Sequence, residues 1–374
     1  MGFGTGSVEG LGVMEFGKTF FGKRVLVTGH TGFKGSWLSL WLSELGAEVA
    51  GLSLPPEKPS LYDSLGLSSL VDSRLGDVRD AAFVEKTVHD VRPEIVFHLA
   101  AQALVRRSYD APAETFATNV LGTAHVLDAV RKTESVRVCQ VITSDKCYEN
   151  REVQGYSYRE DDRLGGHDPY SASKACAEIV ASSYRASFSA ASDGRSISLS
   201  TSRAGNVVGG GDWAQDRLLP DCARALAAGR PIEVRNPRST RPWQFVLEPL
   251  SGYLALAARQ LAEPMLYAEA WNFGPSLGVA LDAGAVADLA VRAWGSGRWT
   301  SPASDGSEPH EAGNLKLDSK KASDRLGWKP VYGTADAVAR TIAWYRAASA
   351  PGFDAAAFSR AQIAEYAAAA GNAR

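Results

Sequence analysis

Tyr170 and Lys174 are the residues whose spacing most clearly suggests chemistry, because they stand four apart at the start of a predicted helix. This spacing places both side chains on one helix face. A tyrosine with a pKa of about 10 is a poor base at neutral pH, but a neighbouring ammonium favours the phenolate and lowers that pKa. The tyrosine can then take a proton from a hydroxyl whose carbon loses a hydride. Such pairs also arise by chance, so the interpretation needs support from other motifs.

A glycine-rich loop supplies that support. The segment from Gly29 to Gly35 reads G-x-x-G-x-x-G, between a predicted strand at Lys23–Thr28 and a predicted helix at Gly35–Leu45. In this setting Gly29 allows a tight turn, Gly32 lets the backbone approach a pyrophosphate, and Gly35 lets helix and strand pack closely. The helix N-terminus then faces the phosphates of a dinucleotide. An ordinary glycine-rich turn is the alternative. Together with the Thr143-Ser144 hydroxyls at a later strand end, the loop makes chance the weaker explanation of the Tyr170–Lys174 spacing.

The choice between NAD and NADP usually depends on a residue about 20 positions after the loop. Here the second predicted strand, Glu48–Leu54, ends without an acidic residue at its tip and without an adjacent Arg. The absence of Arg favours NAD, and the absence of an acid predicts modest affinity. Asp77 follows a third strand, where it either meets the adenine or caps a helix.

Strands alternate with long helices through the first half of the chain. The clearest later elements are strands at Glu94–Ala100, Arg137–Ser144 and Ser196–Arg203, and helices at Glu114–Lys132 and Tyr170–Ser187. This alternation predicts right-handed βαβ units, and therefore an α/β fold with a Rossmann-type, doubly wound parallel sheet. After Gly205 frequent prolines interrupt the pattern, which predicts a smaller α/β substrate-binding lobe.

The expected organisation has four parts. Residues 1–20 are predicted as a flexible Gly-rich arm, in which Met14 offers an alternative start, and residues 21–205 as the dinucleotide-binding domain. Residues 206–349 mainly form the substrate lobe, with later segments such as Glu248–Leu261 packing back on the first domain. Residues 350–374 are an Ala-rich helical tail.

Composition excludes several classes of protein. Lys plus Arg is 40 and Asp plus Glu is 42, so the formal net charge of −2 gives no basic footprint for a nucleic acid. No apolar run reaches about 18 residues, so no membrane span is expected. The four cysteines contain no C-x-x-C pair, which predicts reduced thiols in a cytoplasmic protein and neither a disulfide framework nor a metal site.

Several longer stretches resemble one known family. Those at 98–102, 119–123 and 326–330 are similar to the extended short-chain dehydrogenase/reductases that act on nucleotide sugars. Four others are more specific and resemble the CDP-glucose 4,6-dehydratases: GHTGFKGSWL (29–38), TSDKCYEN (143–150), RAGNVVGGGDW (203–213) and RPWQFVLEPLSGYL (241–254). The resemblance runs from about Lys23 to Tyr345 and so covers most of the chain.

The resemblance implies a redox-neutral dehydration. Tyr170, helped by Lys174, would remove the proton of the carbon-4 hydroxyl, which Ser144 holds, while hydride passes to NAD. Lys146 would then take the proton on carbon 5 and Asp145 would protonate the departing carbon-6 hydroxyl. Lys146 must be neutral for this and Asp145 protonated, whereas their adjacency favours the charged form of each and burial opposes it. We expect the two to titrate as a coupled pair.

The resemblance also implies the binding residues. The nucleotide sugar, CDP-glucose, is expected to contact Gln102, Ser144, Asn206, Arg217 and Arg241, and a position that holds His in the family holds Phe245 here. NAD is expected to contact Gly29, Thr31, Gly32, Phe33, Lys34, Gly35, Asp77, Val78, Leu99, Ala100, Ala101, Asn119, Tyr170 and Lys174. The sequence does not decide whether Lys34 faces a phosphate or solvent.

Two alternatives stay open. One is a dehydratase or 4-epimerase of another nucleotide sugar, and the other is a non-catalytic dinucleotide sensor on the same fold. The intact Tyr170 and Lys174 count against the sensor. The resemblance further implies a homodimer or tetramer, with the helices at Glu114–Lys132 and Tyr170–Ser187 forming the shared face.

Overall fold

The computed structural model describes residues 17–188, 196–275, 281–301 and 315–372 of the 374-residue chain. Most of the predicted N-terminal arm therefore lies outside the described residues. Residues Gly17–Phe20 form a 3₁₀ turn, and Phe20 at its end is fully buried. The last part of the predicted arm is thus packed into the first domain.

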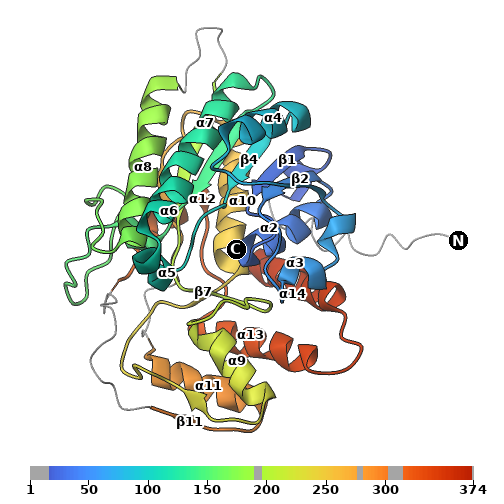
Figure 1. Cartoon of the computed structure of the whole chain (residues 1–374), viewed down its shortest axis with the longest axis vertical. Coiled ribbons are helices and arrows are strands. Elements are labelled where there is room, and N and C mark those ends of the chain that lie inside the picture. Colours follow the sequence, from blue (N-terminus) through green and yellow to red (C-terminus); the bar gives the residue numbers. More distant parts are fainter. Residues whose placement is uncertain (1–16, 189–195, 276–280, 302–314, 373–374) are drawn as a thin grey trace, which may run out of the picture.

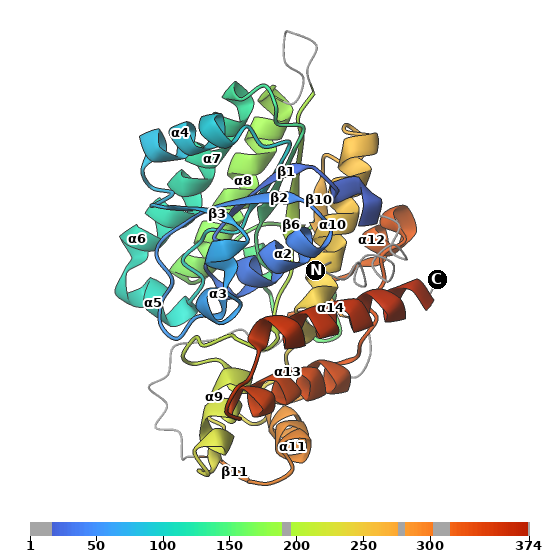
Figure 2. The same ribbon diagram turned by 90° about the vertical axis from the view of Figure 1, so that its right-hand side faces the viewer.

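Seven parallel strands form the main sheet, in the order β10-β6-β5-β4-β1-β2-β3 (Figures 1 and 2). They are β1 (Arg24–Thr28), β2 (Glu48–Ser53), β3 (Asp72–Leu75), β4 (Ile95–His98), β5 (Val138–Ile142), β6 (Ser198–Arg203) and β10 (Ala270–Asn272). The strand order reverses between β1 and β4, and ligands of such sheets bind outside the carboxyl ends of the strands at this reversal. The predicted doubly wound sheet is confirmed.

Helices cover both faces of this sheet (Figure 2). One face carries α4 (Ala81–Val91), α5 (Val105–Asp110), α6 (Pro112–Phe116), α7 (Gly122–Lys132) and α8 (Pro169–Phe188). The other carries α2 (Phe33–Glu44), α10 (Leu247–Ala262) and α12 (Lys320–Leu326), with the short α3 (Leu61–Ser64) nearby. The helix expected at Glu114–Lys132 is a continuous run in which a π turn, Ala117–Leu121, joins α6 to α7.

The smaller lobe contains α9 (Leu218–Ala227), α11 (Ala283–Trp294) and α13 (Thr334–Ala348), with the parallel pair β8 (Ile232–Glu233) and β11 (Trp299–Thr300) (Figure 1). A second parallel pair, β7 (Val207–Val208) and β9 (Gln244–Phe245), lies between the lobe and the main sheet. One buried apolar cluster includes residues of α2 and α10 as well as of the three lobe helices. Burial of this shared surface holds the lobe against the sheet domain.

The C-terminal helix α14 (Ala355–Asn372) packs against α2. Arg360 donates to Glu44 at 2.7 Å, and the rings of Tyr366 and Trp41 meet edge to face at 5.8 Å between centroids. The hydroxyl of Tyr366 donates to Glu248 at 2.7 Å and lies 2.9 Å from the Ser251 hydroxyl. The predicted tail is therefore docked on the body of the protein.

Glu248, at the start of α10, lies at the centre of this docking. Its carboxylate also accepts the backbone N–H groups of Val331 and Tyr332, at 2.7 to 3.1 Å. Burial raises the pKa of Glu248 to about 7, although these donors favour its charged form. The carboxyl therefore joins α10, the segment before α13, and α14.

We predict that Tyr366→Phe lowers the free energy of unfolding by about 1–3 kcal/mol, because it leaves buried partners of the hydroxyl unsatisfied. Tyr332→Phe is the matched control, since no partner of the Tyr332 hydroxyl is found among the described residues. Urea unfolding of both variants measures the difference. Equal losses in the two variants would contradict the role given to Tyr366.

Candidate active site

The loop between β1 and α2 needs glycine at two of its three glycine positions. Gly29 has φ 76°, and a Cβ added there would lie 2.8 Å from the backbone nitrogen of Ala100. A Cβ at Gly35 would lie 2.0 Å from the carbonyl oxygen of Gly29. At Gly32, φ is −80° and a Cβ would come no closer than 3.4 Å to its nearest neighbour, so the fold itself does not require glycine there. The free space beside Gly32 suits the approach of a bound group.

The residues between the glycines are tied to the second strand. The Thr31 hydroxyl lies 2.7 Å from the Ser53 hydroxyl at the tip of β2 and donates to the carbonyl of Leu54. His30 is buried against Gly51, and burial lowers the pKa of its imidazole to about 4. Hydroxyl groups thus replace the acidic residue usual at this strand end. Sequence reasoning gave no role to His30, which fills the space beside β2.

The structure shows which groups the Asp77 carboxylate contacts within the protein. Its carboxylate accepts from the backbone and the guanidinium of Arg79, at 2.5 to 2.8 Å. Asp80, not Asp77, caps α4, because its side chain accepts the backbone N–H of Phe83. The alternative that made Asp77 a helix cap is therefore wrong, and the adenine contact of Asp77 stays a prediction. Val78 is buried.

The segment after β4 is held by Asn119 and Gln102. Asn119, in the π turn, accepts the backbone N–H of Gln102 at 2.9 Å and donates to its carbonyl and to the Ser173 hydroxyl. The side-chain amide of Gln102 is itself bonded to the backbone of Leu104 and to the Thr115 hydroxyl. Gln102 therefore supports its own loop and is not among the residues that line the cavity, so its substrate contact stays a prediction. Leu99, Ala100 and Ala101 lie along this segment, beside the glycine loop.

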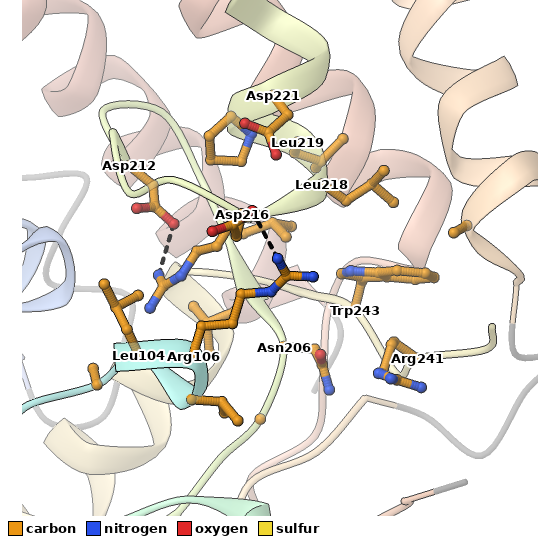
Figure 3. A pocket seen from close by; sticks show the side chains of 18 of the residues that line it. Leu104, Arg106, Asn206, Asp212, Asp216, Leu218, Leu219, Asp221, Arg241 and Trp243 are labelled. Carbon is orange, nitrogen blue, oxygen red and sulfur yellow. Dashed lines mark hydrogen bonds and ion pairs between the residues drawn. The ribbon is translucent and has the colours of Figure 1, made fainter. Parts of the chain in front are cut away.

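A cavity of about 1100 Å³ opens between the carboxyl edge of the sheet and the lobe. The sheet domain contributes the start of α2, the end of β5 and the start of α8, and the lobe contributes charged residues (Figure 3). Of the predicted site residues, those that line the cavity are Phe33, Lys34, Ser144, Asp145, Lys146, Tyr170, Asn206, Arg217 and Arg241. Chain segments far apart in the sequence thus meet in one space.

Tyr170 and Lys174 lie on the buried face of α8, as their spacing predicts. The Lys174 ammonium donates to the carbonyl of Ile142, at the end of β5, at 3.4 Å. Burial lowers the pKa of Lys174 to about 8, against the effect of Glu178. Burial also raises the pKa of Tyr170 to about 12, although a hydrogen bond with Ser144 opposes this. Burial thus determines the direction of the shift in the protein alone, and the lowering expected from the ammonium together with a cationic nicotinamide ring stays a prediction.

Ser144, Asp145 and Lys146 form a tight turn directly after β5. The Ser144 hydroxyl donates to Asp145 at 2.9 Å and accepts the backbone N–H of Lys146 at 3.2 Å. Asp145 is 2 % exposed, and its Oδ2 has no hydrogen-bond partner among the described residues. Burial raises the pKa of this carboxyl, against the effects of Lys146, Ser144 and Arg241. The shift has the direction that an acid catalyst requires.

Gly205 is a site residue that sequence reasoning missed. A Cβ at this position would lie 1.8 Å from Oδ2 of Asp145, so any larger residue would displace the carboxyl. The same stretch, 203–213, was noticed only for its resemblance. A signal was present in the sequence, because Gly205 stands two residues after the end of β6, where the regular alternation of the first domain stops.

The lobe brings cationic groups to the cavity. Arg217 donates to Asp212 at 2.8 Å, and Asn206 has a left-handed φ of 49° and accepts the backbone N–H of Gln244 through its carbonyl. Figure 3 shows Arg241 beside Asn206 and Trp243. Arginines suit a diphosphate because they form paired, charge-assisted hydrogen bonds.

Phe245 lies outside this group. It is fully buried in the core between Trp37 and Tyr332, with ring centroids 6.4 and 6.1 Å away. The departure from the family pattern at Phe245 therefore affects packing, and it raises no direct question about contacts to a nucleotide base.

Lys34 is partly exposed and lies in the wall of the cavity. Its ammonium lies 6.0 Å from the ring centroid of Tyr253. Burial lowers its pKa to about 7, and the nearby charges of Lys174 and Arg217 add to that effect. The side chain therefore faces the cavity, and its contact with a phosphate of the dinucleotide stays a prediction.

The comparisons with known proteins agree with this geometry. Residues 26–341 match the family described as GDP-mannose 4,6 dehydratase. The chain is 48% identical over 330 residues to a CDP-glucose 4,6-dehydratase of Salmonella typhimurium, with 87% of this chain and 91% of the relative covered.

Two solved structures share the fold. A dTDP-glucose 4,6-dehydratase of Streptomyces venezuelae, a double mutant with NAD bound, has a TM-score of 0.70 at 23% identity, covering 86% of this chain and 97% of that one. A UDP-glucose 4-epimerase of Thermotoga maritima, with UDP-glucose, has a TM-score of 0.73 at 21% identity, covering 86% and 98%.

The doubly wound sheet, the glycine loop and the Tyr170–Lys174 pair define an extended short-chain dehydrogenase/reductase. Within that class the chain belongs to the GDP-mannose 4,6-dehydratase family, since the family match and the 48% identical relative both span most of its length. Two further findings bear on its expected partners. Along the described ranges no helix is long and apolar enough to cross a membrane. Nor do three or more His, Cys, Asp or Glu side chains gather there as a metal site.

Proposed function

We propose that this protein is a CDP-glucose 4,6-dehydratase, which converts CDP-D-glucose to CDP-4-keto-6-deoxy-D-glucose and water. The observation that carries the proposal is the turn of Ser144, Asp145 and Lys146, its first two residues buried, which lines one cavity with Tyr170. An epimerase needs the tyrosine and the serine, whereas elimination of water also needs an acid and a base. The 48% identity to the Salmonella enzyme supports the choice of nucleotide.

The first domain fits a bound NAD. The free space at Gly32, the N-terminus of α2 and the buried Lys174 suit the pyrophosphate and the ribose next to the nicotinamide. Leu99 to Ala101 and Asn119 would line the same edge of the sheet. NAD held there would supply the hydride acceptor for oxidation at carbon 4 and the hydride that carbon 6 later receives. The positive ring of NAD also favours the phenolate of Tyr170, which burial alone disfavours.

Tyr170 and the side chains of the turn perform the proton transfers. Tyr170 takes the proton of the carbon-4 hydroxyl, which the Ser144 hydroxyl orients. The resulting ketone acidifies the hydrogen on carbon 5, and Lys146 takes that proton. Asp145 gives its proton to the departing carbon-6 oxygen, which leaves as water. Lys146 then returns its proton to carbon 5, and the proton held by Tyr170 replaces the one that Asp145 lost, so the net change is one water.

The lobe would hold the rest of the substrate. Arg217, Arg241 and Asn206 line the cavity and would bind the diphosphate. Asp212 fixes the direction of Arg217 through their ion pair. A neutral protein can thus bind a dianionic group with a few placed cations.

A substrate panel tests the proposed activity. Incubation with CDP-glucose, UDP-glucose and dTDP-glucose, with and without added NAD, is expected to give a 4-keto-6-deoxy product from the cytidine substrate only. Mass spectrometry detects the loss of water from the nucleotide sugar. Product from another nucleotide alone, or a 4-epimer without loss of water, would overturn the proposal. Binding of NAD without turnover of any sugar would favour the dinucleotide sensor.

The roles of Asp145 and Lys146 make a second prediction. Asp145→Asn and Lys146→Ala are each expected to lower kcat for water loss by about 100-fold or more, because each removes one proton transfer. Both variants keep Tyr170, so reduced cofactor should accumulate on mixing with CDP-glucose, as followed by its absorbance. Tyr170→Phe is the control that should abolish this reduction. Full dehydratase activity in both turn variants would contradict the assignment.

We also propose that the protein is a cytoplasmic homodimer joined through α7 and α8. Four exposed apolar side chains support this: Phe116 in α6 and Leu121 in the π turn that continues into α7, and Ile179 and Phe188 in α8, with Leu121 56% and Ile179 57% exposed. The two helices pack side by side (Figure 1). Exposed apolar side chains on adjacent helices favour an interface with a second copy.

Ile179→Glu is expected to convert the dimer to a monomer, because it would bury a charge in the shared face. Light scattering after gel filtration measures the mass. Leu70→Glu is the control, since Leu70 is an exposed apolar residue in the turn before β3 and should leave the mass unchanged. A monomeric wild type would refute the dimer.

A further inference from the structure

Glu178 lies on α8 beyond the two catalytic residues of that helix. It follows Tyr170 and Lys174 at the next interval of four residues, and it is 2 % exposed. One carboxylate oxygen accepts the Thr143 hydroxyl at 2.5 Å, and the other accepts the Thr201 hydroxyl at 2.7 Å. Burial alone would raise the pKa of Glu178, but Arg203 and the hydroxyl donors lower it by more, so the net shift is downward and favours the charged carboxylate.

Arg203 is the partner of that charge. Its guanidinium, on the last residue of β6, donates to Glu178 at 2.8 Å and is equally buried. It also donates to the Tyr148 hydroxyl at 2.6 Å and lies 4.9 Å from the centroid of the Tyr148 ring. The Tyr148 hydroxyl in turn donates to Asn272, on β10, at 2.8 Å. The ion pair is therefore tied to β6, to β10, to the residue that follows β5 and to α8.

The two contact points of the ion pair stand on either side of the catalytic turn. Thr143 directly precedes Ser144, and Tyr148 follows Cys147, the last residue of the 3₁₀ turn. Glu178 holds the first and Arg203 holds the second. Ser144, Asp145 and Lys146 thus form a short bridge whose two ends are fixed to one buried pair.

We propose that Glu178 and Arg203, through Thr143 and Tyr148, act as positioning residues that set where Asp145 and Lys146 stand relative to Tyr170. The proposal rests on the proposed dehydratase activity. Tyr170 belongs to α8 and not to the turn, although its hydroxyl meets Ser144. A displaced turn would shift both groups that perform the elimination, but only the orienting Ser144 among the groups that perform oxidation at carbon 4. Elimination would therefore be impaired more than oxidation.

The hydroxyl contacts give a cleaner test than the ion pair. Removing one member of a buried ion pair leaves an unpaired charge and strongly destabilises a protein. Thr143→Val and Tyr148→Phe instead each remove one contact to the pair and keep nearly the same volume. Thr143→Ser keeps the hydroxyl and is the conservative variant. Thr341→Val, which loses one buried hydroxyl bond within α13, controls for stability.

The experiment measures kcat and KM for CDP-glucose, together with the absorbance of reduced cofactor on mixing. Thr143→Val is expected to lower kcat by about 10- to 100-fold and to change KM by less than about twofold, because a displacement of about 1 Å is enough for such a loss. Reduced cofactor should accumulate in this variant. Thr143→Ser and Thr341→Val should resemble the wild type, and Tyr148→Phe should resemble Thr143→Val.

The outcomes separate two failures. A wild type that does not dehydrate CDP-glucose overturns the proposed function. If the wild type is active, the positioning role is overturned when Thr143→Val and Tyr148→Phe have the same kcat as the wild type. It is also overturned when their losses appear only in KM, or when kcat falls without accumulation of reduced cofactor. If Thr143→Val unfolds below the assay temperature, Tyr148→Phe decides by the same two readouts.

Discussion

The parallel direction of all seven strands is the constraint on which the site depends. It brings every strand's carboxyl end to one edge, and the reversal between β1 and β4 leaves room there for a ligand. The edge is crowded, since Gly29 and Gly35 admit no Cβ without a clash with neighbouring backbone. The glycine loop, the segment after β4 and the turn after β5 consequently meet at fixed positions.

Burial, more than pairing, sets the charges at this edge. It raises the pKa of Asp145 and of Tyr170 and lowers the pKa of Lys174 and of Lys34. Each of these groups is thereby moved toward its neutral form before any ligand enters. A cationic ring and an anionic diphosphate then shift the same groups again, so ligand binding and proton transfer are coupled through desolvation.

Local sequence signals were sufficient for the sheet, the glycine loop and the Tyr170–Lys174 pair, since each depends on spacing within one strand or helix. They were insufficient wherever a side chain acts across elements. Asp77 and Asp80 both stand at positions before α4 where a cap is plausible, and the structure shows that Asp80 performs that role. The sequence also gives no sign that the amide of Gln102 supports its own loop. Gly205 and Lys34 come close to Asp145 only because the fold brings the end of β6 and the start of α2 beside the turn, which no local sequence pattern shows.

The docking of α14 has a consequence for how the protein is made. Glu248 and Tyr366 are hydrogen-bonded although they stand 118 positions apart in the chain. During synthesis α10 therefore emerges from the ribosome long before its final hydrogen-bond donor. At the usual 5–20 residues per second, that interval is roughly 6 to 24 seconds. Throughout it the Glu248 carboxyl lacks its tyrosine partner, and the surface of α2 that α14 covers stays open to water or to a chaperone.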